Sequence, residues 1–323
     1  MTPAAGGGDG ERALSPRAAA THRRPIGRIS RVRGIRRQTV VGYLFVLPAL
    51  VMYGLFVLQP LGLTLQYSLY RWDGVGPATW VGLSNYVTVL TEPRLLETLF
   101  NAFRLVLFFS FVPVTLGLVT AAVIHRVATG RLGTLSRTVL FLPQVIPLVA
   151  AGIIWGRLLS LSGLVNQSLT AIGLGDTTRA WLGDFDTALP AVGVIGIWVL
   201  LGFCTVLLLT GMAKLDAALY ESARLDGANW FQEFRAITVP GVRNELGVCV
   251  TVTIIAALAA FDVVYVSTGG GPGGATAVPG IQIYILAFLE RQVGLASALA
   301  VVLMVLVLIV ILPIQRLTRD DAR

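Results

Sequence analysis

The stretch TALPAVGVIGIWVLLGFCTVLLLTGMA, residues 187–213, decides the fold class, because it contains no Asp, Glu, Lys, Arg or His over its whole length. An α-helix rises about 1.5 Å per residue, so roughly 20 apolar residues cross the hydrocarbon core of a bilayer. Further charge-free blocks cover 38–70, 105–124, 138–156, 246–261 and 292–315. The sequence therefore predicts an all-α membrane protein with six transmembrane helices, at about 41–65, 102–125, 138–160, 188–210, 245–266 and 293–315.

The charge-free block 263–289 has a different pattern. Its part 268–280 contains six glycines and two prolines, which favour a loop over a span. Its part 281–289 is too short to cross a bilayer and is interpreted as a short interfacial or external helix. Within the third span, Pro143 and Pro147 are expected to kink or loosen the helix.

The composition excludes an ordinary soluble enzyme. Hydrophobic residues make up 55% of the chain and charged residues 13%, whereas soluble domains carry about 25% charged residues. Lys214 is the only lysine, and Ala213 precedes it where the phosphate-binding motif G-x-x-x-x-G-K-[ST] requires Gly. The two histidines, His22 and His125, cannot form H-E-x-x-H, so we predict no catalytic residue, no metal site and no cofactor bound by this chain.

The basic residues predict the orientation of the spans. With the N-terminus inside, 19 of the 25 Lys and Arg residues fall on the cytoplasmic side and six outside, in agreement with the positive-inside rule. We therefore expect both termini in the cytoplasm and a multi-pass protein of the plasma or inner membrane. Residues 1–40 hold nine arginines and few large apolar residues, which predicts a disordered basic cytoplasmic tail before a membrane domain at 41–323. The tail is interpreted as a determinant of topology rather than as an arm that binds nucleic acid or anionic lipid.

The longest ordered segment predicted on the cytoplasmic side, about 211–244, reads GMAKLDAALYESARLDGANWFQEFRAITVPGVRN. Asp216 is a suitable N-cap for a helix that begins at the next residue, and Gly227 suits the left-handed position after that helix. Asn229 can cap a second helix, which Pro240 is expected to end. The pattern predicts two short amphipathic helices joined by a sharp turn, which should pack on the spans, on lipid or on a partner.

The same segment resembles a known family. Glu221-Ser222-Ala223, Gly227, Ile237 and Val239-Pro240 are similar to the E-A-A…G…I-x-L-P loop of permease subunits in binding-protein-dependent ABC importers, with Ser222 and Val239 as mild departures. Further motifs resemble the carbohydrate importers of the maltose and glycerol-phosphate type: GLSNY at 82–86, FLPQVIP at 141–147 followed by Trp155, GLVN at 163–166, and FD…STGGGP…AT at 261–276. Because these motifs occur in the family's order, the resemblance covers the chain from about residue 41 to its end.

The resemblance implies a permease subunit that forms half of the transmembrane pathway of an ATP-driven importer and is not itself an enzyme. The implied partners are a second permease subunit, an ABC ATPase dimer that holds ATP and Mg, an external solute-binding protein, a carbohydrate substrate and membrane lipid, with no nucleic acid. It further implies a cytoplasmic coupling helix between the fourth and fifth spans that docks on the ATPase. The residues carried over to this coupling role are Glu221, Ser222, Ala223, Gly227 and Pro240.

The family's substrate pocket lies within the membrane, largely between the fourth and fifth spans. In this chain the candidate pathway residues are Gly196, Trp198, Phe203, Ala257, Phe261 and Asp262. Asp262 is the one carboxylate deep in a block fit to span, and the fifth span is expected to run through it. It is interpreted as a helix cap or a hydrogen-bond partner of the Gly-rich loop more readily than as a gate or substrate contact, and Arg104 is a possible partner.

Two other function classes are weaker. A stand-alone secondary transporter usually has more spans, paired repeats and several buried charges, whereas this sequence has six predicted spans, one deep carboxylate and no evident repeat. A membrane-embedded hydrolase would need a nucleophile and a base at bilayer depth, and neither G-x-S-x-G nor a partner for His125 is found. The sequence leaves open which carbohydrate is carried and whether the permease pair consists of identical or different chains.

Overall fold

The computed structural model describes residues 32–127 and 130–318. Most of the expected basic tail, residues 1–31, therefore lies outside the described residues. The chain divides into two units, Met1–Val57 and Leu58–Arg323. In the first unit α1 spans Val32–Tyr53, so helix begins nine residues before the expected start of the membrane domain, and a π-helical turn, η1 (Gly54–Leu58), follows.

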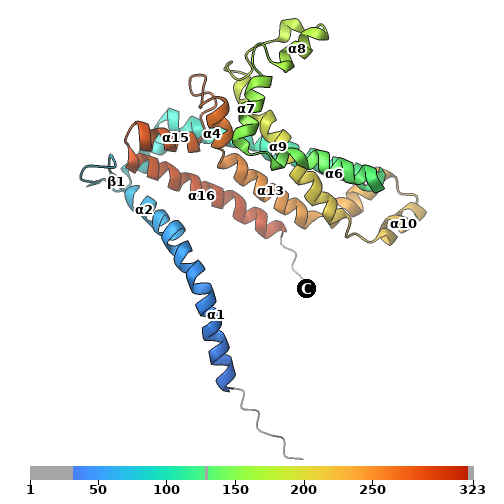
Figure 1. The fold of residues 1–323 in the computed structure, drawn as a ribbon, viewed down its shortest axis with the longest axis horizontal. Coiled ribbons are helices and arrows are strands. Elements are labelled where there is room, and N and C mark those ends of the chain that lie inside the picture. The colour runs from blue at the N-terminus through green and yellow to red at the C-terminus, as the bar shows by residue number, and fades with distance from the viewer. Residues whose placement is uncertain (1–31, 128–129, 319–323) are drawn as a thin grey trace, which may run out of the picture. The chain divides into compact units, whose positions relative to one another are not determined.

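The second unit is mostly helical where the structure describes it (Figure 1). Its two short strands, β1 and β2, pair antiparallel, with Tyr70 opposite Trp80. In chain order its elements are α2 (Gln59–Tyr67), β1 (Tyr70–Arg71), β2 (Thr79–Trp80), α3 (Ser84–Thr91), α4 (Pro93–Val106), η2 (Leu107–Phe111), α5 (Val112–Val127), α6 (Gly130–Val145), α7 (Leu148–Leu158), α8 (Leu164–Ala171), η3 (Gly175–Thr177), α9 (Ala188–Met212), α10 (Ala217–Leu225), α11 (Trp230–Glu233), η4 (Phe234–Thr238), α12 (Val239–Gly241), α13 (Arg243–Leu258), α14 (Asp262–Ser267), α15 (Pro279–Tyr284), η5 (Ile285–Leu289) and α16 (Val293–Thr318).

Four of the described helices are long and apolar enough to cross a membrane, and the number rises to six if each of two bent helix pairs counts as one span. The four are Val41–Tyr67, Pro93–Val127, Ala188–Met212 and Val293–Arg316, which confirms the first, second, fourth and sixth predicted spans as apolar helices. The bent pairs are Gly133–Val145 with Leu148–Leu158, at 97°, and Trp230–Gly241 with Arg243–Leu258, at 71°.

The third span, expected at 138–160 with a helix kinked or loosened by its prolines, is bent by 97°. It breaks between α6 and α7, and Pro147 lies at the N-cap of α7 with an extended backbone (ψ 138°). A proline has no amide hydrogen to donate and disfavours the helical conformation of the residue before it, which explains the break at this point. Pro143, by contrast, lies inside α6, so only one of the two prolines interrupts the helix.

The fifth span differs from its prediction, because it does not continue through Asp262. Helix α13 ends at Leu258, and Asp262 begins a separate short helix, α14. The turn between them carries Val263 and Val264 into the hydrophobic core, where their exposed fractions are 2% and 0%. Burial of this apolar pair favours the turn over continuation of the helix.

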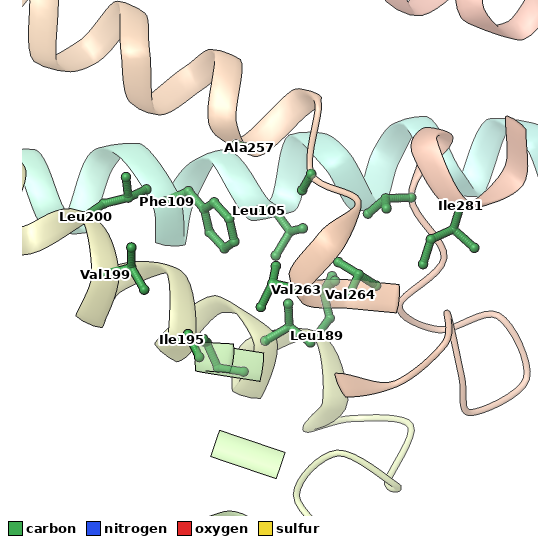
Figure 2. Packing of buried hydrophobic residues seen from close by; sticks show 14 residues of the cluster. Leu105, Phe109, Leu189, Ile195, Val199, Leu200, Ala257, Val263, Val264 and Ile281 are labelled. Carbon is green, nitrogen blue, oxygen red and sulfur yellow. The ribbon is translucent and has the colours of Figure 1, made fainter. Parts of the chain in front are cut away.

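The largest core cluster lies where η2 and the end of α4 meet α9, α13 and α14. Figure 2 shows Phe109, Ile195 and Val263 among the side chains that meet there. Glycines allow α9 to approach its neighbours closely: a Cβ on Gly196 would overlap the ring of Phe109, and one on Gly202 would overlap the carbonyl of Leu140. Helix α9 is therefore the central support of the unit.

Candidate functional site

The backbone of the segment 211–244 is fixed by side-chain caps at each turn. The Asp216 carboxylate accepts a hydrogen bond from the Ala218 amide (2.9 Å) and begins α10. Gly227 follows α10 with φ +83°, the left-handed conformation that glycine adopts without strain. Asn229 and Gln232 form a reciprocal capping box, with bonds of 3.0 and 2.7 Å, that begins α11. These observations confirm the predicted starts of both helices and the turn between them.

The end of the second helix differs from the prediction. Pro240 does not end it, because the helix Trp230–Gly241 continues past the proline to the bend at Val242. A π-helical turn, η4, directly precedes α12, the short helix that contains Pro240. A π-helical turn interrupts the regular backbone hydrogen bonds of a helix. Pro240 has no amide hydrogen to donate, so the turn accommodates it without ending the helix.

Ion pairs between one buried carboxylate and two half-exposed arginines hold the segment to the end of α5. The side chain of Glu233 is only 5% exposed; its Oε1 accepts a hydrogen bond from Arg224 Nε (2.9 Å), and its Oε2 lies 3.7 Å from Arg126 Nη1. The Glu233 carboxylate raises the pKa of Arg224 above its ordinary value, chiefly through this hydrogen bond. A second link joins Tyr220 and Thr238, whose hydroxyl oxygens are 3.0 Å apart. The sequence did not indicate a role for Glu233. Its partner Arg224 is brought close by the turn after α10, and its partner Arg126 belongs to the distant helix α5.

The remaining candidate coupling residues lie on an open surface of α10. Glu221 and Ser222 are exposed, and Ala223 is half-buried. Leu225, one helical turn after Glu221, is 89% exposed. Glu221 also lies at a hollow of about 420 Å³ whose wall includes His125 and Arg126. This part of α10 therefore offers a carboxylate beside a large, uncovered apolar side chain.

The candidate pathway residues do not all converge. Gly196, Phe261 and Asp262 line a cavity of about 170 Å³, together with Phe109, Leu148, Val199, Leu200, Ala256, Ala259, Ala260 and Val263. This volume is below the ~300 Å³ at which ligand pockets begin. The other three candidates lie outside the cavity lining: Ala257 is fully buried in the core, Trp198 packs edge-on against Trp155 (5.8 Å between ring centroids), and Phe203 packs in a separate core cluster.

The side chain of Asp262 is exposed in this arrangement. Within residues 32–127 and 130–318 no hydrogen bond to its carboxylate is found, and the expected pairing with Arg104 is wrong. The Arg104 guanidinium instead donates to Glu97 Oε1 (2.6 Å) and Asn101 Oδ1 (2.8 Å). The turn that separates α14 from α13 explains the error, because the prediction placed Asp262 inside a continuous span.

Other side chains hold the Gly-rich loop that follows α14. The Thr276 hydroxyl is fully buried and donates to the carbonyl oxygen of Gly271 (2.6 Å). Asn101 of α4 donates to the carbonyl oxygens of Ala275 (3.2 Å) and Ala277 (3.0 Å). Thr276 and Asn101, and not Asp262 as expected, therefore hydrogen-bond to this loop.

Two motifs noted in the sequence connect loops. In the motif at 82–86, Asn85 donates to the carbonyl oxygens of Ser68 (2.8 Å) and Tyr70 (2.9 Å). In the motif at 163–166, Asn166 is 3% exposed and accepts a hydrogen bond from Trp181 Nε1 (2.8 Å). Both asparagines thus hydrogen-bond to groups that are distant along the chain. They shape the loops and do not contribute reactive groups.

Residues 114–317 match the family described as binding-protein-dependent transport system inner membrane component. The chain is 36% identical over 276 residues to the probable ABC transporter permease protein YurN of Bacillus subtilis, covering 85% of this chain and 94% of the relative. It is 35% identical to the trehalose/maltose transport system permease protein MalF of Thermococcus litoralis, covering 88% and 96%. It is 33% identical to the diacetylchitobiose uptake system permease protein NgcF of Streptomyces coelicolor, covering 80% and 77%.

A similar fold occurs in a solved bacterial ABC transporter involved in the import of the acidic polysaccharide alginate. The TM-score is 0.75 at 22% identity, covering 90% of this chain and 99% of that chain. The same fold is seen in the alginate transporter in complex with a periplasmic protein bound to an alginate pentasaccharide, again with a TM-score of 0.75. At this level of identity the likeness shows the fold alone.

Proposed function

Because the chain belongs to the family of binding-protein-dependent transport system inner membrane components, we propose that it forms half of the transmembrane pathway for a sugar or sugar-like solute. It is a multi-pass permease subunit of an ABC importer and carries no enzymatic function, as the sequence motifs predicted. The names of two relatives, a trehalose/maltose permease and a diacetylchitobiose permease, support a sugar as the solute. The stand-alone secondary transporter is thereby set aside.

The proposal includes the partners that the motifs imply. A second permease subunit completes the pathway, an external solute-binding protein delivers the solute, and an ATPase dimer holds ATP and Mg. In the solved alginate transporter a periplasmic protein accompanies the complex, which supports the second of these partners. In this arrangement both termini and the segment 211–244 face the cytoplasm, where the ATPase acts.

The observation that carries the coupling role is the surface of α10. The helix is capped by Asp216 and braced through Arg224 and Glu233, so it is held in place before a partner arrives. Its exposed side nevertheless presents Glu221 beside Leu225, whose burial by a partner would be favourable. A rigid helix with an uncovered apolar and acidic side suits docking into a groove of the ATPase.

The test is co-purification of the ATPase with Glu221→Lys in membranes that contain the complete importer. We expect normal insertion of the permease, loss of the ATPase from the purified complex, and loss of ATP-driven uptake in vesicles supplied with maltose, trehalose or diacetylchitobiose. Asp176→Lys reverses an exposed carboxylate outside the segment and should retain the ATPase. Full recovery of the ATPase with Glu221→Lys would refute the coupling role.

A further inference from the structure

Four aromatic rings from α14, its N-cap, α15 and η5 form a continuous series. The ring centroids of Phe261 and Tyr265 are 5.2 Å apart, and those of Tyr265 and Tyr284 are 5.6 Å apart. Tyr284 also lies 6.0 Å from Phe261 and 5.5 Å from Phe288. These separations are within the range of direct aromatic pairs, so the four side chains form one connected surface.

The series connects the cavity to the surface of the chain. At one end Phe261 lines the cavity beside Asp262. Farther along, Tyr265 is 46% exposed, and at the other end Phe288 is 73% exposed. The series of rings therefore leads from the surface at Phe288 to Phe261 and Asp262 at the edge of the cavity.

Polar groups accompany the rings. Tyr265 lies beside Tyr284, with 5.6 Å between the ring centroids, and its phenol raises the pKa of Tyr284 above its ordinary value. The two phenols and the Asp262 carboxylate thus supply donors and acceptors beside aromatic faces. A pyranose ring needs this combination, because one face of the sugar is apolar and its hydroxyl groups lie around the edge.

We propose that Phe261, Tyr265, Tyr284 and Phe288 form an aromatic path that binds sugar rings on their way into the cavity. The proposal rests on the proposed import of a sugar and adds the residues that guide it. Tyrosines of a membrane-interface belt each place a polar tip among lipid headgroups. The aromatic path instead packs two phenylalanines and two tyrosines against one another, with one stacked pair and three tilted or edge-on pairs, and it begins at the cavity lining.

The test measures sugar uptake and ATP hydrolysis together in proteoliposomes that contain the complete importer and saturating binding protein. The sugars are maltose, trehalose and diacetylchitobiose. In Tyr265→Ala and Tyr284→Ala we expect the number of sugars moved per ATP hydrolysed to fall about tenfold, because each variant removes a stacking surface. Tyr284→Phe retains the ring and loses one hydroxyl group, so we expect a smaller loss than in Tyr284→Ala, and normal binding-protein-stimulated hydrolysis in this variant reports that the site is folded.

Phe185→Ala removes an exposed aromatic ring outside the series and serves as the control, with an unchanged ratio of uptake to hydrolysis. If uptake and binding-protein-stimulated hydrolysis fall by the same factor in the tyrosine variants, the rings form a docking or gating surface and the proposal is wrong. If neither changes, the rings are a membrane-interface belt and the proposal is equally wrong. If the parent transporter moves none of the three sugars, the proposed substrate class fails first, and the aromatic path fails with it.

Discussion

The segment 211–244 and the surroundings of the cavity are stabilised by different kinds of interaction. In the segment, Asp216, Asn229 and Glu233 each make directional bonds that determine where a helix begins or what it rests on. Around the cavity, the turn into α14 has no side-chain cap at Phe261 and depends on the burial of apolar side chains. The molecule thus combines a segment held by polar bonds with a cavity wall held by close packing.

The difference matters for transport. In the proposed coupling role the segment has to keep its shape, and its caps together with the ion pairs of the buried Glu233 carboxylate hold that shape. The walls of a pathway have to change their spacing, and apolar contacts without hydrogen bonds can be rearranged without leaving unpaired polar groups.

Gly202→Val tests close packing on the helix that supplies part of the cavity wall, α9, at its contact with α6 just beyond the cavity-lining Leu200. The new side chain would overlap the carbonyl group of Leu140, which belongs to the backbone of α6 and cannot move aside by a rotamer change. We expect a loss of about 3 kcal/mol in the free energy of unfolding and a lower yield of folded chain. The measurement is thermal unfolding of the purified protein in detergent. Gly156→Ala is the control, since a Cβ at Gly156 has open space.

Glu233→Gln tests the polar bonds that stabilise the segment 211–244. The amide keeps the size of the side chain but loses the charge that attracts Arg224 and Arg126, which should destabilise the segment by about 2 kcal/mol. Faster hydrogen exchange confined to α10 and α11, with reduced recovery of the ATPase, would support the bracing role. Glu97→Gln is matched to it, because the Glu97–Arg104 pair is more than half exposed and should contribute less than about 0.5 kcal/mol. Equal effects of the two changes would contradict the comparison.

The difference between local polar caps and packing against distant helices explains what could be predicted from the sequence. Asp216, Gly227 and Asn229 act on backbone groups within three residues, so their roles are visible in the local sequence. The break at Pro147 was partly visible, because a proline signals a kink but not its angle. The turn before Asp262 was not visible, because it depends on burial of Val263 and Val264 against helices that are distant along the chain. Glu233 was missed for the same reason.

Gly227→Val has a smaller expected effect than the loss of Glu233. At φ +83° a β-branched residue costs about 1–2 kcal/mol, although no atom lies near enough to clash with a new Cβ. We expect a shifted α10, weaker docking of the ATPase and reduced uptake, measured against the parent at equal permease levels. Gly227→Asn should retain most of the activity, since asparagine tolerates the left-handed conformation. Identical losses in both variants would show that backbone strain is not the cause.

Asp216→Ala makes the smallest change, because it removes one cap and leaves the ion pairs of Glu233 intact. The Ala218 amide loses its partner, which should cost about 1 kcal/mol and fray only the first turn of α10. Asp216→Asn retains an acceptor at the same position and should restore the turn, as hydrogen exchange at residues 217–219 would report. Because the brace through Arg224 lies at the other end of α10, docking of the ATPase should survive the loss of this cap. Loss of docking in Asp216→Ala would mean that the caps, rather than Glu233, determine the position of the helix, and the comparison would then have to be revised.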